Sequence, residues 1–330
     1  MKEKGVATTV VAIIVIVIVA VAGVSGYLLL LKSGPTESSP GAEGENQEGE
    51  KPGQFTVIEE NLLFTGGYTD PSVIQMPDGT YLMYLNRRAR EGENWSGSFV
   101  LSSGDGIFWN EETGIVFLGV AVGRAFRFPN GVRYYYHQPP REKENRGTIV
   151  SSFSTDGITN WTYEGVRIRP REGHAVAGPG VVRLKDGTYR MFFFEKELID
   201  TDPRRATSRE IYGASSKDGL SWRRDEAPTI VYEENVEGAG LPHPQRGQVL
   251  HPFVIEWPEQ NGYLMLYNSH SRIFAAYSQD GFNWEKLGYT GIVGADADAI
   301  RLPDGSFRIY FGDFSPETLG VVYTAILKVE

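Results

Sequence analysis

The sequence predicts an all-β protein: a five-bladed β-propeller preceded by an N-terminal transmembrane helix and a flexible stalk. Three observations lead to this prediction. The pattern Ser-x-Asp-Gly-x-x-Trp occurs four times, once with an extra residue. Five Asp-Gly or Asn-Gly pairs are each followed by a strand-like apolar run, and no amphipathic helical periodicity follows residue 54. A small unit that recurs at intervals of about fifty residues is typical of stacked repeat architectures.

The first segment, residues 1–32, is expected to be a membrane anchor. Residues 5–31 carry no charge, and at about 1.5 Å per residue they exceed a hydrocarbon core of roughly 30 Å. Lys2 and Lys4 precede this run, and the far side is acidic. Because positive charge stays in the cytoplasm, we expect a single-pass protein of the cell membrane with its body outside the cytoplasm.

A cleaved signal peptide is the alternative, since residues 22–26 are small enough for a cleavage site. Residues 33–53 are small, polar or acidic. They cannot bury a core, so a disordered acidic stalk is expected between the anchor and a propeller that spans 54–330.

Composition narrows the classes of partner and cofactor. The formal net charge is −10, and no Lys/Arg run resembles a nucleic-acid surface. The chain has no cysteine, which excludes disulfides and thiolate metal sites. Its five histidines form no short ligand motif such as H-E-x-x-H. We therefore expect membrane contact through residues 5–31, no nucleic acid, no cofactor and no metal.

Each repeated unit reads as a four-stranded antiparallel meander. A turn with Asp-Gly or Asn-Gly is a strong hairpin signal, because both turn residues adopt positive φ. The strand-like runs that follow these turns are PDGTYLMYLN (77–86), PNGVRYYYHQ (129–138), KDGTYRMFFFE (185–195), QNGYLMLYNSH (260–270) and PDGSFRIYFGD (303–313). Five such hairpins predict five blades around one axis, in a propeller expected to be monomeric.

The Ser-x-Asp-Gly-x-x-Trp boxes are expected to turn the third strand of a blade into the fourth. The fifth blade has no box, because the chain stops after 319–330. Residues 54–64 alternate as a strand does, so we expect them to supply the missing outer strand and close the ring. The box tryptophans are expected to pack between blades; they are Trp109, Trp161, Trp222 and Trp284.

Two positions in each blade are expected to converge near the axis: the start of the first strand and the end of the second, which share a face because the strands are antiparallel. The first position gives Tyr68, Thr69, Asp70, Val122, Gly123, Arg124, His174, Ala177, Gly178, His251, Asp296 and Asp298. The second gives Asn86, Arg87, His137, Glu195, Asn268, His270 and Asp313. All the histidines lie at these positions or in adjoining loops, where His243 lies. They indicate a polar funnel, although histidines also cap strands and line loops for structural reasons.

The stretch YTDPSVIQMPDGTYLMYLN (68–86) resembles the opening blade of the five-bladed glycoside hydrolases. These are the arabinanase, levansucrase and invertase group, including glycoside hydrolase families 43, 32, 62, 117 and 130. The boxes are similar to those of the same enzymes. The resemblance covers residues 55–330 and implies carbohydrate as the partner, with Asp70 of Asp70-Pro71 as a catalytic carboxylate.

The chain departs from family 43 at two of three expected carboxylates. Ala177 stands where the resemblance implies the general acid Glu, and no Asp lies at Val122-Gly123, where the carboxylate that tunes the acid is expected. The candidates for a second proton-handling group are Glu195 and Glu197 at the end of a blade-three strand, Asp296 or Asp298 in blade five, and a histidine acting as the acid. A hydrolytic pair would stand about 5–9.5 Å apart.

Three functions stay open. The first is a glycoside hydrolase, or a phosphorylase that uses Arg87, Arg88, Arg124 and His174 for phosphate. The second is a glycan-binding propeller that lost the acid. The third is a metal-dependent enzyme that uses the histidines. A central Ca²⁺, present in some relatives, leaves no signature that could be read from the sequence.

Overall fold

The computed structural model describes most of the chain that follows the predicted stalk. The described residues are 53–87, 97–112, 116–118, 121–138, 147–197, 208–234, 248–313 and 320–329. The predicted anchor and nearly all of the stalk lie outside these ranges. Within the described ranges, the structure contains no helix with the length and apolar character needed to cross a membrane.

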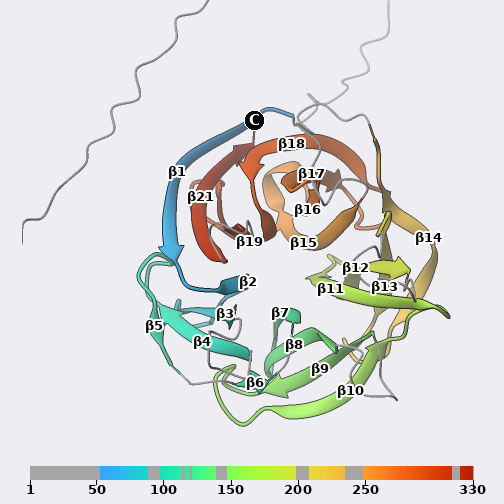
Figure 1. The fold of residues 1–330 in the computed structure, drawn as a ribbon, viewed down its shortest axis with the longest axis horizontal. Helices are drawn as coiled ribbons and strands as arrows, with labels where there is room; N and C mark the ends of the chain where they lie inside the picture. The colour runs from blue at the N-terminus through green and yellow to red at the C-terminus, as the bar shows by residue number, and fades with distance from the viewer. Residues whose placement is uncertain are drawn as a thin grey trace, which may run out of the picture. The chain divides into compact units, whose positions relative to one another are not determined.

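Five antiparallel sheets stand around a common axis, as Figure 1 shows. Blade 1 consists of β2 (Tyr68–Gln75), β3 (Tyr81–Arg87), β4 (Gly97–Ser103) and β5 (Asn110–Glu111), with β6 (Phe117–Leu118) also paired to β4. Blade 2 consists of β7 (Ala121–Phe128), β8 (Gly131–Gln138), β9 (Thr148–Ser154) and β10 (Thr162–Ile168).

The other three blades have the same order from axis to rim. Blade 3 consists of β11 (His174–Arg183), β12 (Tyr189–Glu197), β13 (Glu210–Ser216) and β14 (Arg223–Val231). Blade 4 consists of β15 (Val249–Trp257), β16 (Gly262–Ser269), β17 (Arg272–Ser278) and β18 (Glu285–Val293), with a 3-10 turn, Pro258–Gln260, between β15 and β16. Blade 5 consists of β19 (Ala295–Arg301), β20 (Phe307–Asp313), β21 (Val321–Val329) and β1 (Phe55–Phe64).

The two ends of the propeller meet in blade 5. Strand β1 pairs antiparallel with β21, from Phe55 opposite Val329 to Phe64 opposite Val322. The segment expected to close the ring is therefore the outer strand of that blade. Without β1 the hydrogen-bonding edge of β21 would be open, and an open edge invites pairing with other chains.

The four boxes share one hydrogen-bonding pattern, which explains their recurrence. In blade 3, the hydroxyl oxygen of Ser216 accepts from the Gly219 amide at 2.8 Å. Asp218 Oδ1 accepts from the next two amides, those of Leu220 and Ser221, at 2.8 Å each. The corresponding contacts form in the other three boxes. The backbone hydrogen bonds to Ser221 and Leu220 outweigh desolvation and lower the pKa of Asp218.

Each box tryptophan packs edge-on against an aromatic ring of the preceding blade, as predicted. The pairs, with ring centroids 5.3–6.0 Å apart, are Trp109–Tyr310, Trp161–Tyr84, Trp222–Tyr135 and Trp284–Phe192. Each of the three tyrosines also donates its hydroxyl to the carbonyl of the neighbouring box glycine, at 2.6–2.8 Å. The fourth ring, Phe192, has no hydroxyl and makes no such bond.

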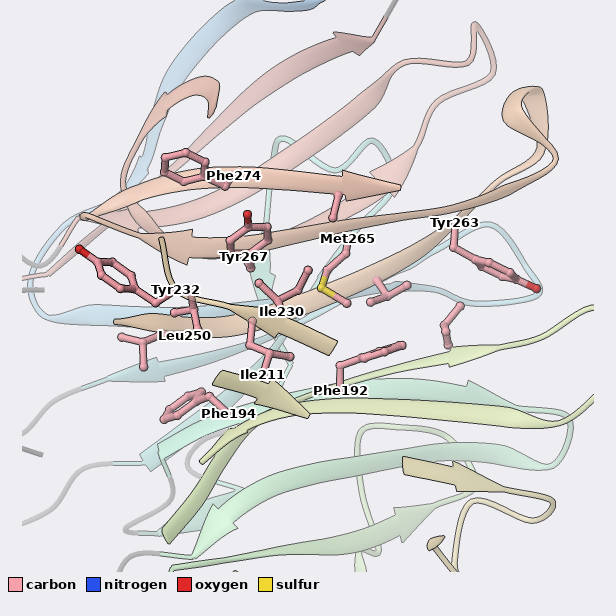
Figure 2. Packing of buried hydrophobic residues seen from close by; sticks show 14 of the residues in the cluster. Phe192, Phe194, Ile211, Ile230, Tyr232, Leu250, Tyr263, Met265, Tyr267 and Phe274 are labelled. Carbon is pink, nitrogen blue, oxygen red and sulfur yellow. The ribbon is translucent and has the colours of Figure 1, made fainter. Parts of the chain in front are cut away.

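Apolar side chains fill the space between successive blades. Figure 2 shows the cluster between blades 3 and 4, where Phe192, Phe194 and Ile211 face Leu250 and Met265. Strands that are apolar on both faces, as the sequence indicates, are thus covered on both sides. This packing holds the innermost strands at fixed positions around the axis.

Candidate functional site

One backbone feature repeats at the start of every innermost strand. A residue with positive φ interrupts the pairing of the first and second strands in each blade. These residues, in blade order, are Asp70 (52°), Val122 (50°), Gly178 (61°), His251 (51°) and Asp296 (56°). Such bulges re-aim side chains next to functional sites. A non-glycine residue in this region is strained, and a β-branched valine more so.

The side chains of three of these five residues come together. Asp70, His251 and Asp296 each place one possible ligand atom within 4.8 Å of the other two. They belong to blades 1, 4 and 5, which are consecutive because blade 5 adjoins blade 1. Asp70 is 8% exposed and Asp296 is 3% exposed. The cluster is therefore a nearly buried polar group built from three separate sheets.

Asp70 is held by its neighbours in blade 1. Its Oδ2 accepts from Thr69 Oγ1 and from Asn86 Nδ2, each at 3.0 Å, and the Ser98 hydroxyl donates to Asn86 Oδ1. Burial raises the pKa of Asp70 to about 6, helped by the charge of Asp296 and a hydrogen bond with it; His251 and Asn86 act in the opposite direction. This carboxyl therefore keeps its proton to a higher pH than an ordinary aspartate and loses it as the pH rises through about 6.

Asp296 is held from blade 4. Its amide donates to Asn268 Oδ1 at 3.0 Å, and Asn268 Nδ2 donates to the Gly294 carbonyl at 3.1 Å. Asp296 Oδ1 lies 2.7 Å from His251 Nδ1. Burial alone would raise the pKa of Asp296, but His251 and the hydrogen bond from Asp70 outweigh it, so the pKa is lowered. The pKa values of the two aspartates are thus moved apart, so that below about pH 6 the pair carries one proton, on Asp70, beside an ionised Asp296.

The two carboxyls of the cluster lie close together. One candidate ligand oxygen of each carboxyl lies within 4.8 Å of the other, whereas carboxylates that flank a glycosidic bond are separated by about 5–9.5 Å. The expectation that Asp296 faces Asp70 agrees with the structure. The separation expected for a hydrolytic pair stays a prediction.

Arg124 and Asp298 lie next to the cluster and tie three blades together. Arg124 of blade 2 donates to the Pro71 carbonyl at 2.6 Å and to the Ala297 carbonyl at 3.0 Å. Its Nε lies 3.6 Å from Asp298 Oδ2, and burial raises the pKa of Asp298 to about 7 against the effect of Arg124. Arg124 is 3% exposed. It is engaged with backbone rather than presented to an incoming phosphate.

Glu195 does not join the cluster, contrary to the expectation that it would approach from blade 3. Arg171 Nε contacts its Oε2 at 2.7 Å, and Arg224 donates to both of its oxygens. The side chain is buried, which opposes ionisation, yet the hydrogen bonds from Arg224 and Arg171 lower its pKa. A carboxylate neutralised by two guanidinium groups is a poor proton donor, so its setting is that of a structural ion pair.

Three predicted histidines also make contacts away from the cluster. His137 Nδ1 lies 2.8 Å from the Val176 carbonyl, and burial lowers its pKa to about 4. His174 Nδ1 lies 2.8 Å from the Glu172 carbonyl. His270 contacts Tyr232 Oη and Ser269 Oγ at 3.0 and 2.8 Å. His137 and His270 thus link separate segments, while His174 contacts its own loop, and such contacts are the structural alternative for these residues. His243 and Arg88 lie outside the described residues.

The remaining predicted residues occupy strand ends around the same face. Tyr68 pairs with Arg87 across β2 and β3, and its ring packs 5.7 Å from that of Phe64. The Arg87 guanidinium lies 5.6 Å from the centre of the Phe99 ring. Asp313 ends β20, opposite Val321. These residues surround the cluster without being part of it.

The sequence predicts that Thr69 and Asn268 lie at the converging positions, but it assigns them no role in supporting the two aspartates. The signal for Asn268 was present, because Asn268 and Asn86 occupy the same position, opposite the residue before the bulge. The positive φ of His251 and Asp296 left no comparable signal, since neither residue type marks a bulge as glycine does.

Comparison with solved structures identifies the fold. A thermostable family-43 glycoside hydrolase superposes with a TM-score of 0.61 at 17% identity, over 80% of this chain and 93% of that one. A family 117 glycoside hydrolase from Zobellia galactanivorans gives 0.59 at 16%, over 84% and 90%. The β-1,2-mannobiose phosphorylase from Listeria innocua gives 0.56 at 14%, over 82% and 90%.

The chain shares the five-bladed propeller fold of these enzymes. No protein-family model and no curated protein matches the sequence. At such low identity the likeness establishes the fold alone, and the activity has to be argued from the site.

Proposed function

We propose that this protein is a carbohydrate-active propeller, a glycoside hydrolase or phosphorylase that acts where Asp70, His251 and Asp296 meet. The observation that carries the proposal is the convergence of these three residues, two of them buried carboxyl groups, from the innermost strands of three blades, and burial raises the pKa of one of the carboxyl groups, Asp70. Perturbed carboxyl groups at a convergent position are typical of active sites. The similar structures include glycoside hydrolases and a phosphorylase, which supports carbohydrate as the substrate class.

The cluster can handle a proton on one side of a substrate. Protonated Asp70 can donate to a leaving oxygen, while ionised Asp296, beside His251, can accept a proton from water or from a phosphate hydroxyl. Because oxygens of the two carboxyls lie within 4.8 Å of each other, they act as one unit rather than as two groups on opposite faces of a sugar. This arrangement explains how the site could work without the Glu that Ala177 replaces.

A glycan-binding propeller is the second candidate. The alanine at position 177, where the resemblance implies the general acid Glu, favours it. A phosphate-binding role receives less support, since Arg124 is committed to the Pro71 and Ala297 carbonyls.

A substrate panel separates these functions. Full-length protein would be incubated with furanosides and pyranosides, with and without inorganic phosphate, and both turnover and binding would be measured. Asp70→Asn should lower turnover at least a hundredfold and leave glycan binding within about twofold. Asp78→Asn, at an exposed hairpin turn, is the matched control and should behave as the wild type. Binding without turnover on every substrate would instead support the glycan-binding candidate.

We also propose that residues 5–31 anchor the protein in the cell membrane with the propeller outside the cytoplasm. The uncharged run and the lysines before it support this proposal. Membrane fractionation, followed by protease treatment of intact cells, tests it. Recovery of unprocessed protein in the soluble fraction would refute it.

A further inference from the structure

We propose that a hollow on the face of the propeller opposite the cluster binds a segment of a neutral polysaccharide. The hollow lies between the end of blade 3 and the box of blade 4, and Trp222 and Phe282 are among the side chains that line it. This second site is separate from the place where Asp70, His251 and Asp296 meet. The inference therefore goes beyond the proposed function.

The order of the strands puts the hollow at the other end of the blades. In blade 3, His174 at the start of β11 pairs with Glu197 at the end of β12. At the opposite end of the same sheet, Tyr189 at the start of β12 pairs with Ser216 at the end of β13. Ser216 and Thr188 line the hollow, whereas the cluster forms at the starts of the innermost strands. A ligand in the hollow therefore does not compete with a ligand at the cluster.

The size and lining of the hollow suit a few sugar rings. Its volume is about 650 Å³, within the range of roughly 300–1,000 Å³ that is usual for small-molecule sites. The lining combines the rings of Trp222 and Phe282 with the hydroxyls of Thr188, Ser215 and Ser221. An aromatic ring can stack on the apolar C–H face of a sugar, while hydroxyls exchange hydrogen bonds with its edge. A mainly apolar lining with a few placed polar groups is typical of ligand sites.

Phe282 presents an exposed ring that is held in place from behind. The residue is 51% exposed, and the Arg190 guanidinium lies 4.4 Å from the centre of its ring. Arg190 is 1% exposed and donates to Ser215 Oγ and to both carboxylate oxygens of Asp225. Because a cation over a ring face attracts the ring, one side of Phe282 is fixed against the protein and the other stays available to a ligand. A ring ordered in advance loses little conformational freedom on binding.

An aromatic residue at this position is particular to the box of blade 4. The residue that follows the box glycine is aliphatic in the other three boxes, where it is Ile107, Ile158 or Leu220. Ile158 packs against the apolar cluster between blades 1 and 2, so an aliphatic side chain is enough to seal a blade interface. Phe282 instead leaves half of its surface exposed beside the hollow. Stacking on a sugar needs a flat ring, whereas sealing the interface does not.

The charges around the hollow favour a neutral ligand over an acidic one. Lys217 and Arg223 are positive and Asp218 is negative, and Asp218 Oδ1 accepts from two amides of the box turn. Single charges of both signs can hydrogen-bond to sugar hydroxyls, but they do not create the field of one sign that attracts a polyanion. The formal net charge of the chain, −10, also repels an acidic polymer.

The test is affinity electrophoresis of the full-length protein in native gels that contain arabinan, xylan, glucomannan or polygalacturonate. Dissociation constants follow from mobility at several polysaccharide concentrations, for the wild type, Phe282→Leu, Phe282→Tyr and Phe108→Leu. Leucine occupies the corresponding position in the box of blade 3, so Phe282→Leu should fold while it removes the flat ring. Phe108→Leu is the matched control, because Phe108 is 77% exposed in the box of blade 1, outside the hollow. Melting temperatures confirm that each variant is folded.

We expect at least one neutral polysaccharide to retard the wild type, Phe282→Tyr and Phe108→Leu equally, and to bind Phe282→Leu about fivefold more weakly or worse. Wild-type affinity in folded Phe282→Leu, an equal loss in Phe108→Leu or Phe282→Tyr, or retardation by no polysaccharide or by polygalacturonate alone would overturn the assignment. Retardation that depends on Phe282, without turnover of any glycan, would reject the catalytic function alone. Glycan turnover together with retardation that does not depend on Phe282 would reject the hollow alone.

Discussion

Replacing Asp70 by asparagine should stabilise the protein, and the gain should depend on pH. The folded-state pKa of Asp70 is raised from 3.8 to about 6, so ionising this group disfavours the folded state. Its contribution to stability is fully present below about pH 4 and is lost as the pH rises through 6. The introduced asparagine cannot ionise, yet it keeps an acceptor for Thr69 and Asn86 and can donate to Asp296.

The magnitude follows from the size of the shift. A displacement of about 2 pH units corresponds to about 3 kcal/mol, since each unit is worth about 1.4 kcal/mol. The free energy of unfolding in urea would be measured from pH 4 to pH 8 for both proteins. The two curves should nearly meet at pH 4 and differ by about 3 kcal/mol at pH 7.5.

The control for this experiment is Asp78→Asn, which removes one negative charge at an exposed turn and should follow the wild-type curve throughout. Parallel curves for the wild type and Asp70→Asn would show that ionisation of Asp70 carries no folding penalty. The raised pKa of Asp70 would then be wrong.

Three further predictions concern the frame around the site. Removing residues 1–66 should lower the melting temperature by more than 10 °C and promote aggregation, because β21 loses its partner strand β1. Differential scanning calorimetry would compare this variant with a chain that starts at residue 53. Equal melting temperatures would contradict the prediction. Phe192→Tyr should stabilise the fold by about 1 kcal/mol, because the added hydroxyl can donate to the carbonyl of a box glycine as the three tyrosines do; Tyr135→Phe should destabilise the fold by a similar amount. Urea unfolding of both variants measures the free energies of unfolding. A destabilised Phe192→Tyr would show that the interface between blades 3 and 4 has no room for the hydroxyl. Glu195→Gln should destabilise the protein, because Arg171 and Arg224 lose a charged partner. Glycan turnover per folded molecule should stay unchanged. A loss of turnover in the fully folded variant would return Glu195 to the candidate catalytic residues.

The blades could be predicted from the sequence because each is specified locally. The Asp-Gly and Asn-Gly turns, the apolar runs and the Ser-x-Asp-Gly-x-x-Trp boxes lie within a few residues of the contacts that they form. The closing strand could be inferred as well, since a blade with three strands needs a fourth. The positions expected to converge lie at the predicted strand ends, from Tyr68 of β2 to Asp313 of β20.

The membership of the cluster was harder to predict, because it depends on which way a side chain leaves a strand end. Glu195 and Asn86 occupy similar strand ends, but Arg224 of β14 draws Glu195 into an ion pair while Asn86 contacts Asp70. His251 joins the cluster through a backbone bulge, whereas His137 contacts a carbonyl of the next blade. Such choices are made by neighbours distant in sequence, and the spacing of residues along the chain does not contain them.

The pairing of β1 with β21 also sets an order for folding during synthesis. Blades 1 to 4 consist of strands that follow one another along the chain, so each can assemble as soon as its own segment is available. Blade 5 differs, because Phe55 has to wait for Val329, at the opposite end of the propeller sequence. Contacts between such distant segments form slowly, and unpaired edges of partly folded chains are prone to aggregate. The first strand to be synthesised is therefore among the last to find its partner, and the ring stays open until the final strand has been made.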